Sequence, residues 1–156
     1  MSVVALAVSG CNIFGNDDDD DDDGIVVIYK ASLASRSADG YSLIPTSTVS
    51  KAIFSSYDIF EGALKLKNES KEAKNGITCT ATLYKGDTKL YDLVSNKNVG
   101  TIGSGKIYPS DENAYLTSRT WSSSIKNIPD YENGDYKMVI ELNNGQKKEI
   151  KFTITD

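Results

Sequence analysis

Hydrophobic and polar residues alternate along most of the chain after residue 25. In 77–84, Ile, Cys, Ala and Leu alternate with Thr, Thr, Thr and Tyr, and in 150–155 Ile, Phe and Ile alternate with Lys, Thr and Thr. In 60–67, Phe60, Leu64 and Leu66 share one face, and Lys65 and Lys67 take the other. Successive side chains of a strand point to opposite faces of its sheet. The pattern therefore predicts strands with one buried face.

Shorter runs of apolar and β-branched residues predict further strands at 25–31, 50–54, 89–94, 106–108, 115–125 and 136–142. Their spacing is typical of a β-sandwich. Asn144-Gly145 predicts a type I′ hairpin near the end of the chain, because both central residues of that turn need positive φ. Residues 69–74 are too few for a stable helix and predict a loop or a single turn. We expect an all-β sandwich of about 7–9 strands.

Residues 132–136, Glu-Asn-Gly-Asp-Tyr, stand directly before the alternating apolar residues of 138–142. This arrangement resembles the tyrosine corner of Greek-key sandwiches, in which a tyrosine early in the penultimate strand bonds back to upstream backbone. The resemblance implies that Tyr136, which follows Gly134, has a structural role.

The segment from Ile77 to the final hairpin resembles an immunoglobulin-like domain of bacterial surface proteins. It departs from that pattern because no cysteine pair joins the sheets and because Trp121 comes later than the usual tryptophan. The resemblance implies an immunoglobulin-like Greek-key β-sandwich at 25–156.

The N-terminal residues have the order of an export signal. Residues 1–10 carry no charge, and an apolar run ends in Val8-Ser9-Gly10-Cys11. These four residues resemble the bacterial lipoprotein box, whose cysteine receives diacylglycerol and becomes the mature N-terminus. Basic residues, which open such signals, are missing, so we interpret 1–10 as a remnant of the signal or place the true start upstream. The alternative is that Cys11 is an unmodified thiol.

Seven consecutive aspartates, Asp17 to Asp23, follow the cysteine. Like charges repel, and such a segment has too little apolar surface to fold, so we expect 11–24 to be a disordered acidic linker. Residues 12–24 would span roughly 40 Å when extended. Acidic residues after a lipidated cysteine resemble the arrangement in lipoproteins that some diderm bacteria carry to the cell surface. Calcium binding is an alternative, but no D-x-D-x-D-G loop is present.

Outside the aspartate run the charge is nearly balanced. The formal net charge is -5, but the run supplies seven of the 22 acidic residues, which leaves 15 acidic against 17 basic residues. Only Arg36 and Arg119 are arginines, whereas nucleic-acid readers concentrate arginine on one face. We therefore predict no nucleic-acid partner. No run approaches the ~18–20 apolar residues of a transmembrane helix.

The residue types also limit the chemistry. The chain has no histidine, which excludes histidine-activated nucleophiles and histidine zinc sites. Residues 100–106 match the phosphate loop G-x-x-x-x-G-K, but Ile107 replaces its Ser/Thr and Pro109 follows where a helix should run. Ser123-Ser-Ile-Lys126 fits S-x-x-K without the companion motifs of serine acyl-enzymes. Carboxylate pairs for glycoside hydrolysis show no spacing signature. We predict no catalytic residue, cofactor or metal ligand.

Two kinds of side chain are candidates for a role in the folded domain. Cys79 shares the apolar face of its strand with Ile77 and Leu83, which favours a core position over a reactive thiol. Tyrosine has an apolar body and a polar tip, which suits a carbohydrate or peptide surface. The candidates for a recognition face lie near predicted turns and are Tyr84, Tyr91, Tyr108, Tyr115 and Tyr131.

These observations predict a non-enzymatic lipoprotein, exported and held by its lipid in the outer membrane or at the cell surface. Its immunoglobulin-like domain would serve binding or adhesion, with another envelope protein or a surface glycan as partner, or contribute to a surface assembly. An alternative is self-assembly by strand exchange, in which the β-prone segment 25–29 adds to a neighbour's sheet edge. A third is a small hydrolase or nucleotide binder.

Overall fold

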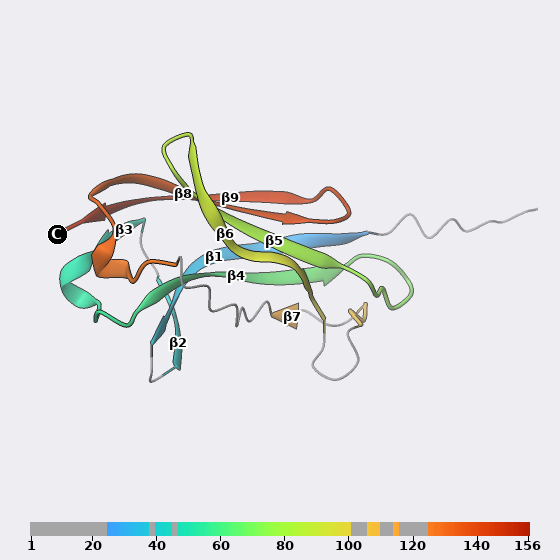
Figure 1. Ribbon diagram of the computed structural model, residues 1–156. Coiled ribbons are helices and arrows are strands. Elements are labelled where there is room, and N and C mark those ends of the chain that lie inside the picture. Colours follow the sequence, from blue (N-terminus) through green and yellow to red (C-terminus); the bar gives the residue numbers. More distant parts are fainter. Residues whose placement is uncertain (1–24, 38–39, 45–46, 101–105, 110–113, 116–124) are drawn as a thin grey trace, which may run out of the picture.

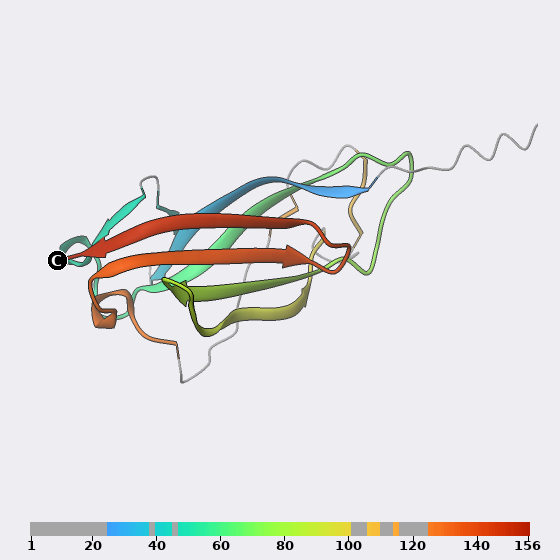
Figure 2. The same cartoon turned by 90° about the horizontal axis from the view of Figure 1, so that it is seen from above.

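Two β-sheets pack face to face (Figures 1 and 2). The computed structural model describes residues 25–37, 40–44, 47–100, 106–109, 114–115 and 125–156. Within them, nine strands are found, which confirms the predicted all-β sandwich: β1 (Val26–Ser37), β2 (Gly40–Leu43), β3 (Thr48–Ser50), β4 (Ile59–Asn68), β5 (Thr78–Lys85), β6 (Thr88–Asn98), β7 (Ala114–Tyr115), β8 (Gly134–Leu142) and β9 (Lys147–Thr155). Two short 3-10 helices precede β4 and β8, namely η1 (Lys51–Ile53) and η2 (Ile128–Asp130). The described part of the chain holds no apolar helix of bilayer-spanning length.

The strand order is that of an immunoglobulin-like sandwich. One sheet has the order β2-β1-β4-β7 and the other β3-β9-β8-β5-β6. The chain changes sheets between β2 and β3, between β3 and β4, between β4 and β5, between β6 and β7, and between β7 and β8. β1, β4 and β7 thus hold the positions of immunoglobulin strands A, B and E, and β5, β8 and β9 those of C, F and G. The predicted Greek-key topology is confirmed.

The buried faces of the two sheets come close together at Gly62 in β4. A Cβ atom added there would lie 3.3 Å from Met138 Sδ and 3.4 Å from both Ala81 Cβ and Ile140 Cδ1. The predicted alternation puts the right side chains inside, since Ala81, Met138 and Ile140 are fully buried. The absence of a side chain at Gly62 therefore lets β5 and β8 pack directly against β4.

Four aromatic rings fill the core at one end of the sandwich. The Phe60 ring centroid lies 5.2 Å from that of Tyr131 and 5.2 Å from that of Phe152. Tyr136 completes the cluster, with centroids 5.8 Å from Tyr131 and 5.7 Å from Phe152. Such tilted, edge-on and offset contacts between rings are favourable beyond the burial of their area.

Some predicted strands are absent or shorter. The strand predicted at 50–54 is wrong, because the chain forms η1 there, Phe54 N donates to Lys51 O (3.1 Å), and Ile53 is 75% exposed. Residues 106–108 contribute only an isolated bridge between Ile107 and Lys74. Of the strand predicted at 115–125, residues 116–124 lie outside the described residues. β2 is a strand that the pattern did not predict.

The predicted type I′ turn is also wrong. Positive φ occurs at Gly145 (φ 90°), and Asn144 is not among the described residues with positive φ. Gly145 N donates to Leu142 O (3.0 Å), and Leu142 N donates to Gln146 O (2.8 Å). This is a three-residue loop that ends in a left-handed glycine. Asn144 stabilises it, since its Oδ1 accepts from Gln146 N and its Nδ2 donates to Val26 O.

The two ends of the sandwich are distinct. Val26, the first residue of β1, lies beside the β8–β9 turn, because Asn144 Nδ2 donates to its carbonyl at 2.8 Å. Lys85 and Tyr136 pair at the other end of the β5–β8 ladder. At about 3.4 Å per residue, the stretch of β8 from Tyr136 to Leu142 separates the ends by about 20 Å. The chain therefore enters the domain at the end opposite the β5–β6 turn (Figures 1 and 2).

Cys79 is buried within the core, 1% exposed. Burial raises the pKa of its thiol to about 12. In the full chain with Cys11→Ser, we expect no modification of the native protein by a thiol reagent near pH 8, and rapid modification in urea. Rapid modification of the native protein would contradict this position. Because the folded state holds the proton more tightly than the unfolded chain, we also expect the free energy of unfolding to fall as the pH rises from about 9 towards 12.

Candidate functional site

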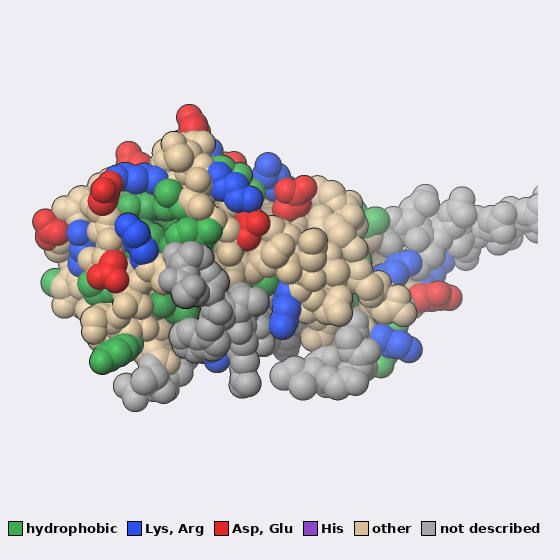
Figure 3. All heavy atoms as spheres, viewed as in Figure 1, with side chains coloured by type: hydrophobic (Ala, Val, Ile, Leu, Met, Phe, Trp, Pro, Cys, Tyr) green, Lys and Arg blue, Asp and Glu red, His purple; other side chains and the backbone are tan. Residues whose placement is uncertain are grey.

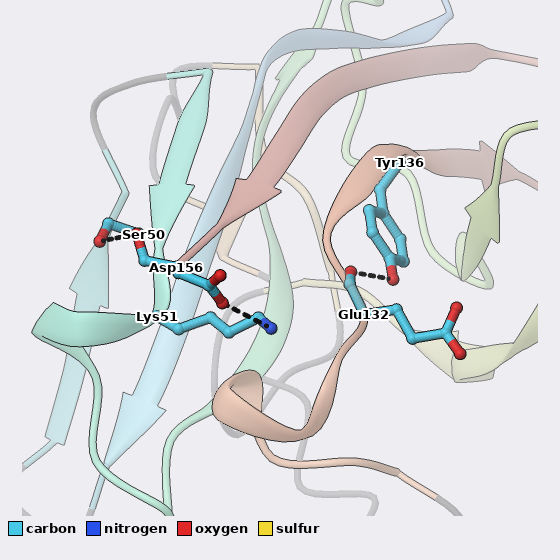
Figure 4. Close-up of polar contacts among 5 residues, drawn as sticks. All are labelled: Ser50, Lys51, Glu132, Tyr136 and Asp156. Carbon is cyan, nitrogen blue, oxygen red and sulfur yellow. Dashed lines mark hydrogen bonds and ion pairs between the residues drawn. The ribbon is translucent and has the colours of Figure 1, made fainter.

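Tyr136 makes the hydrogen bond that defines a tyrosine corner. Its hydroxyl donates to the carbonyl of Glu132 at 2.7 Å (Figure 4). Gly134, between the two residues, has a φ of 140°, which an L side chain rarely adopts. The bond joins the segment after η2 to the start of β8. It thereby fixes the position of the backbone at Glu132 relative to β8.

Replacing Tyr136 by phenylalanine removes this hydrogen bond and keeps the ring. We expect the free energy of unfolding, measured by urea denaturation, to fall by about 1 kcal/mol. Tyr57→Phe is the matched control, because Tyr57 is 76% exposed and its hydroxyl makes no hydrogen bond with the described residues. Equal stability of the two variants would contradict a structural role for the Tyr136 hydroxyl.

A pocket of about 410 Å³ opens beside the tyrosine corner. Side chains of β5, β6 and the segment before β8 converge on it, so residues far apart in sequence meet there. We call it the tyrosine–lysine pocket, and it is lined by Lys85, Lys89, Leu90, Tyr91, Lys126, Tyr131, Glu132 and Tyr136. In the view of Figure 3, hydrophobic side chains gather between charged ones over β6 and the start of β8. Its volume is within the range of ligand pockets.

Tyrosine hydroxyl groups line the inner part of the pocket. The hydroxyls of Tyr91 and Tyr131 hydrogen-bond to each other, and the backbone N–H of Lys126 donates to Tyr91 Oη (3.3 Å). Burial raises the pKa of Tyr91 to about 12, so this hydroxyl stays neutral at physiological pH. Tyr131 is 3% exposed and uses its ring for the core. The tyrosines therefore offer neutral groups that can both donate and accept hydrogen bonds.

Lysines surround the opening of the pocket. The Lys85 ammonium pairs with the Glu132 carboxylate, and Lys89 Nζ lies 3.0 Å from Asp92 Oδ1. The hydrogen bond from Lys85 lowers the pKa of Glu132, and the charge of Lys126 lowers it further. The Lys126 ammonium itself makes no hydrogen bond or ion pair with the described residues. Among the residues that the structure describes, the pocket thus carries one lysine charge without a directly contacting carboxylate.

Asp156, which follows β9, lies near this opening, and its contacts hold the end of β3 in place. Ser50 Oγ donates to the main-chain oxygen of Asp156 (3.1 Å), and Lys51 Nζ lies 3.3 Å from Asp156 Oδ1 (Figure 4). A hydrogen bond from Asn133 and then the contact with Lys51 lower the pKa of the Asp156 carboxyl group. The positive charge of Lys51 also lowers the pKa of Glu132. A second lysine therefore reinforces the positive field around Glu132.

A second hollow, of about 450 Å³, lies over the outer ends of β8 and β9. Lys137 Nζ lies 3.1 Å from Asp87 Oδ1 in this hollow, and Thr153 Oγ1 donates to Asp135 Oδ1 at 2.8 Å. Its two aspartates are balanced by Lys137 and Lys151. We therefore regard the tyrosine–lysine pocket as the candidate site, because its lining carries three lysines, Lys85, Lys89 and Lys126, against one carboxylate, Glu132.

The predicted recognition tyrosines do not form one face. Tyr91 and Tyr131 meet in the pocket. Tyr84 lies on β5 outside it, with Lys137 Nζ 5.2 Å from its ring centroid. Tyr108, 43% exposed, follows Ile107 near the end where β1 begins. Tyr115 belongs to β7, and its side chain lies outside the described residues.

The other sequence predictions fall largely outside the described residues. These include Cys11, the aspartate run, Ser123 and residues 101–105 of the glycine-rich loop. The lysines and Glu132 of the pocket were not predicted, since lysines are spread along the whole chain. The sequence feature that could have indicated them is their position, because Lys85 and Glu132 directly follow two of the candidate tyrosines.

No group of three or more acidic, cysteine or histidine side chains suited to a metal ion is found in the described part of the chain. No protein-family model matches the sequence, and a comparison with curated proteins finds no match. The function of the protein must therefore be inferred from the pocket and the sequence motifs.

Proposed function

We propose that this protein is a lipid-anchored envelope protein whose sandwich domain binds another surface component without catalysing a reaction. The observation that carries the proposal is the position of the tyrosine–lysine pocket, at the end of the sandwich opposite to the entry of the chain at Val26. A lipid at Cys11 and a disordered linker would attach the domain at the end opposite this pocket, which leaves the pocket accessible to a ligand. Val8-Ser9-Gly10-Cys11 and the aspartate run support the anchor.

The chemistry of the pocket supports binding over catalysis. Its tyrosine hydroxyl at Tyr91 is held neutral by a raised pKa. Lys85 is an ammonium group at physiological pH, and the hydrogen bond to Glu132 raises its pKa further, so it is unsuited to act as a base. The chain has no histidine for this task. Such groups form hydrogen bonds and ion pairs with a ligand.

Expression with the native upstream region in a lipoprotein-competent host tests the anchor. We expect the mature chain to begin at Cys11, with a mass increased by the lipid, and we expect protease added to intact cells to remove the domain. Cys11→Ser is the matched control and should leave the protein unlipidated and released from membranes. A mature protein found in the cytosol with an unmodified Cys11 would overturn the proposal.

Strand exchange through 25–29 remains an alternative. In the structure this segment pairs with its own β4, with Val26 opposite Asn68, and Val26 is 1% exposed. The register shifts between Ile28 and Lys30, and Tyr29 is 65% exposed. A bulge of this kind interrupts a strand edge and disfavours edge-to-edge pairing. A concentration-dependent dimer in sedimentation would favour exchange, and a monomer at all concentrations would contradict it.

A further inference from the structure

The charge in the tyrosine–lysine pocket selects for an anionic ligand. Glu132, the carboxylate among the described lining residues, is paired with Lys85, and Lys89 is paired with Asp92 outside the lining. Lys126 adds a further positive charge that has no hydrogen-bonded or ion-paired partner among the described groups. An anion bound beside Lys126 would form a third ion pair, in addition to Lys85–Glu132 and Lys89–Asp92.

The remaining groups of the pocket suit a ligand with many hydroxyl groups. The linked hydroxyls of Tyr91 and Tyr131 can donate to and accept from such a ligand. Leu90, 38% exposed, adds apolar surface at the edge. Sugars have both hydroxyl groups and apolar C–H faces, and aromatic side chains with a polar tip match this combination.

We propose that the tyrosine–lysine pocket binds an anionic saccharide, with its carboxylate or sulfate group at the Lys126 ammonium and its hydroxyl groups at Tyr91 and Tyr131. This inference rests on the proposed function and names the ligand class of that binding module.

An acidic peptide is the competing ligand. A peptide that recognises the edge of a sheet adds as a further strand and needs a regular ladder of backbone groups. β6 is the outer strand of its sheet in the described residues, but its pairing with β5 shifts register at three places, between Cys79 and Ala81, Ala81 and Thr82, and Leu83 and Tyr84. Bulges of this kind disrupt strand addition. The edge therefore favours a ligand held by side chains.

Calorimetric titration of the full chain carrying Cys11→Ser tests the proposal. The probes are tetragalacturonate and its fully methyl-esterified form, which has the same sugar hydroxyl groups but carries uncharged methyl esters in place of the carboxylates. We expect the acid to bind at least about tenfold more tightly than the ester, which corresponds to one charge-assisted hydrogen bond. Raising the salt from roughly 0.05 to roughly 0.5 M should weaken binding of the acid.

Matched variants locate the binding. Lys126→Gln should weaken binding of the acid about tenfold and reduce the preference for the acid over the ester. Lys97→Gln makes the same charge change on β6 near the opposite end, where Lys97 pairs with Cys79, and should change nothing. Tyr91→Phe should weaken both the acid and the ester about fivefold, because it removes a hydroxyl and no charge.

A sulfated tetrasaccharide derived from heparin and a hexaglutamate peptide complete the test. Binding of the sulfated saccharide with the same dependence on Lys126 supports the proposal and identifies sulfate as the anion. Equal affinity for the acid and the ester, tighter binding of hexaglutamate, or no binding of either anionic saccharide overturns it. A lipidated, surface-exposed protein that binds neither saccharide overturns this inference alone. If the protein binds the saccharide through Lys126 but its Cys11 is unmodified in the cell, only the proposal of a lipid anchor is overturned.

Discussion

Replacing Phe60 by alanine should lower the free energy of unfolding by about 3–5 kcal/mol. Phe60 is 1% exposed and lies on the inner face of β4, with ring centroids of Tyr131 and Phe152 both 5.2 Å away. Its removal loses the transfer free energy of the ring and leaves a cavity between the sheets. The rigid backbones of β4 and β9 limit how far the surrounding rings can move to fill it.

Urea denaturation of the full chain measures this effect through the midpoint and the slope of the transition. Tyr57→Ala is the matched control, because it also removes an aromatic ring but at a position that is 76% exposed. We expect the control to change stability by less than about 0.5 kcal/mol. A Phe60→Ala variant that lost no more stability than the control would show that the ring cluster is not part of a packed core.

The sequence pattern predicted the long strands well because one face of each strand packs in the core and the other faces away from it. In β5, Cys79, Ala81 and Leu83 are buried and the threonines between them point to the other side, as a period of two requires. Burial of one face determines the register, since a shift by one residue would expose the whole apolar set. The same pattern in β8 and β9 was sufficient to predict a sandwich.

The errors lie where a local contact overrides the pattern. Residues 50–54 end in the apolar run 52–54, yet η1 forms there, and Asp58 Oδ2 accepts from Ser55 N (2.7 Å) as the chain turns towards β4. Asn144 bonds to Gln146 N and to the distant carbonyl of Val26, which favours the three-residue loop over the type I′ turn. The contact between Asn144 and Val26 joins opposite ends of the sequence, so the residues around the turn do not predict it.

The candidate site was predictable only in part. Tyr91 and Tyr131 were among the tyrosines proposed from the sequence, but the contact that brings them together joins positions 40 residues apart. Lys126 was considered only as part of an S-x-x-K match. Its role depends on the chain bringing its backbone N–H to Tyr91 Oη, which follows from the fold and from no residue pattern.

The tyrosine corner connects the stability of the fold to the geometry of the pocket. Tyr136 bonds to the carbonyl of Glu132, and the Glu132 carboxylate pairs with Lys85 at the pocket opening. The ring of Tyr136 packs edge-on against Tyr131, whose hydroxyl contacts Tyr91. The groups that line the pocket are thus attached to the most tightly packed part of the core, so a ligand would meet a preorganised site.

Asn68→Ala should lower the free energy of unfolding by about 3 kcal/mol, at the end of the sandwich where the chain enters. Asn68 is 2% exposed, and its Nδ2 donates to Glu72 O (2.7 Å) and Ile107 O (2.8 Å). Its Oδ1 accepts from the N–H (2.9 Å) and the hydroxyl (2.6 Å) of Ser70. The substitution removes all four bonds and leaves the buried Ser70 N–H without its partner, which costs more than a hydrogen bond exchanged with water.

The Asn68→Ala substitution should also destabilise its own surroundings more than the rest of the domain, because these bonds join the segment after β4 to Ile107. Hydrogen exchange should therefore speed up at Ser70 and Ile107 before it does in β8, which lies among other strands. Asn98→Ala is the matched control, since Asn98 is an exposed amide at the end of β6 and should change stability by less than about 0.5 kcal/mol. Equal exchange at Ser70 in both variants would mean that the side chain of Asn68 does not hold this segment, and that backbone contacts such as Ile107 N to Lys74 O are sufficient.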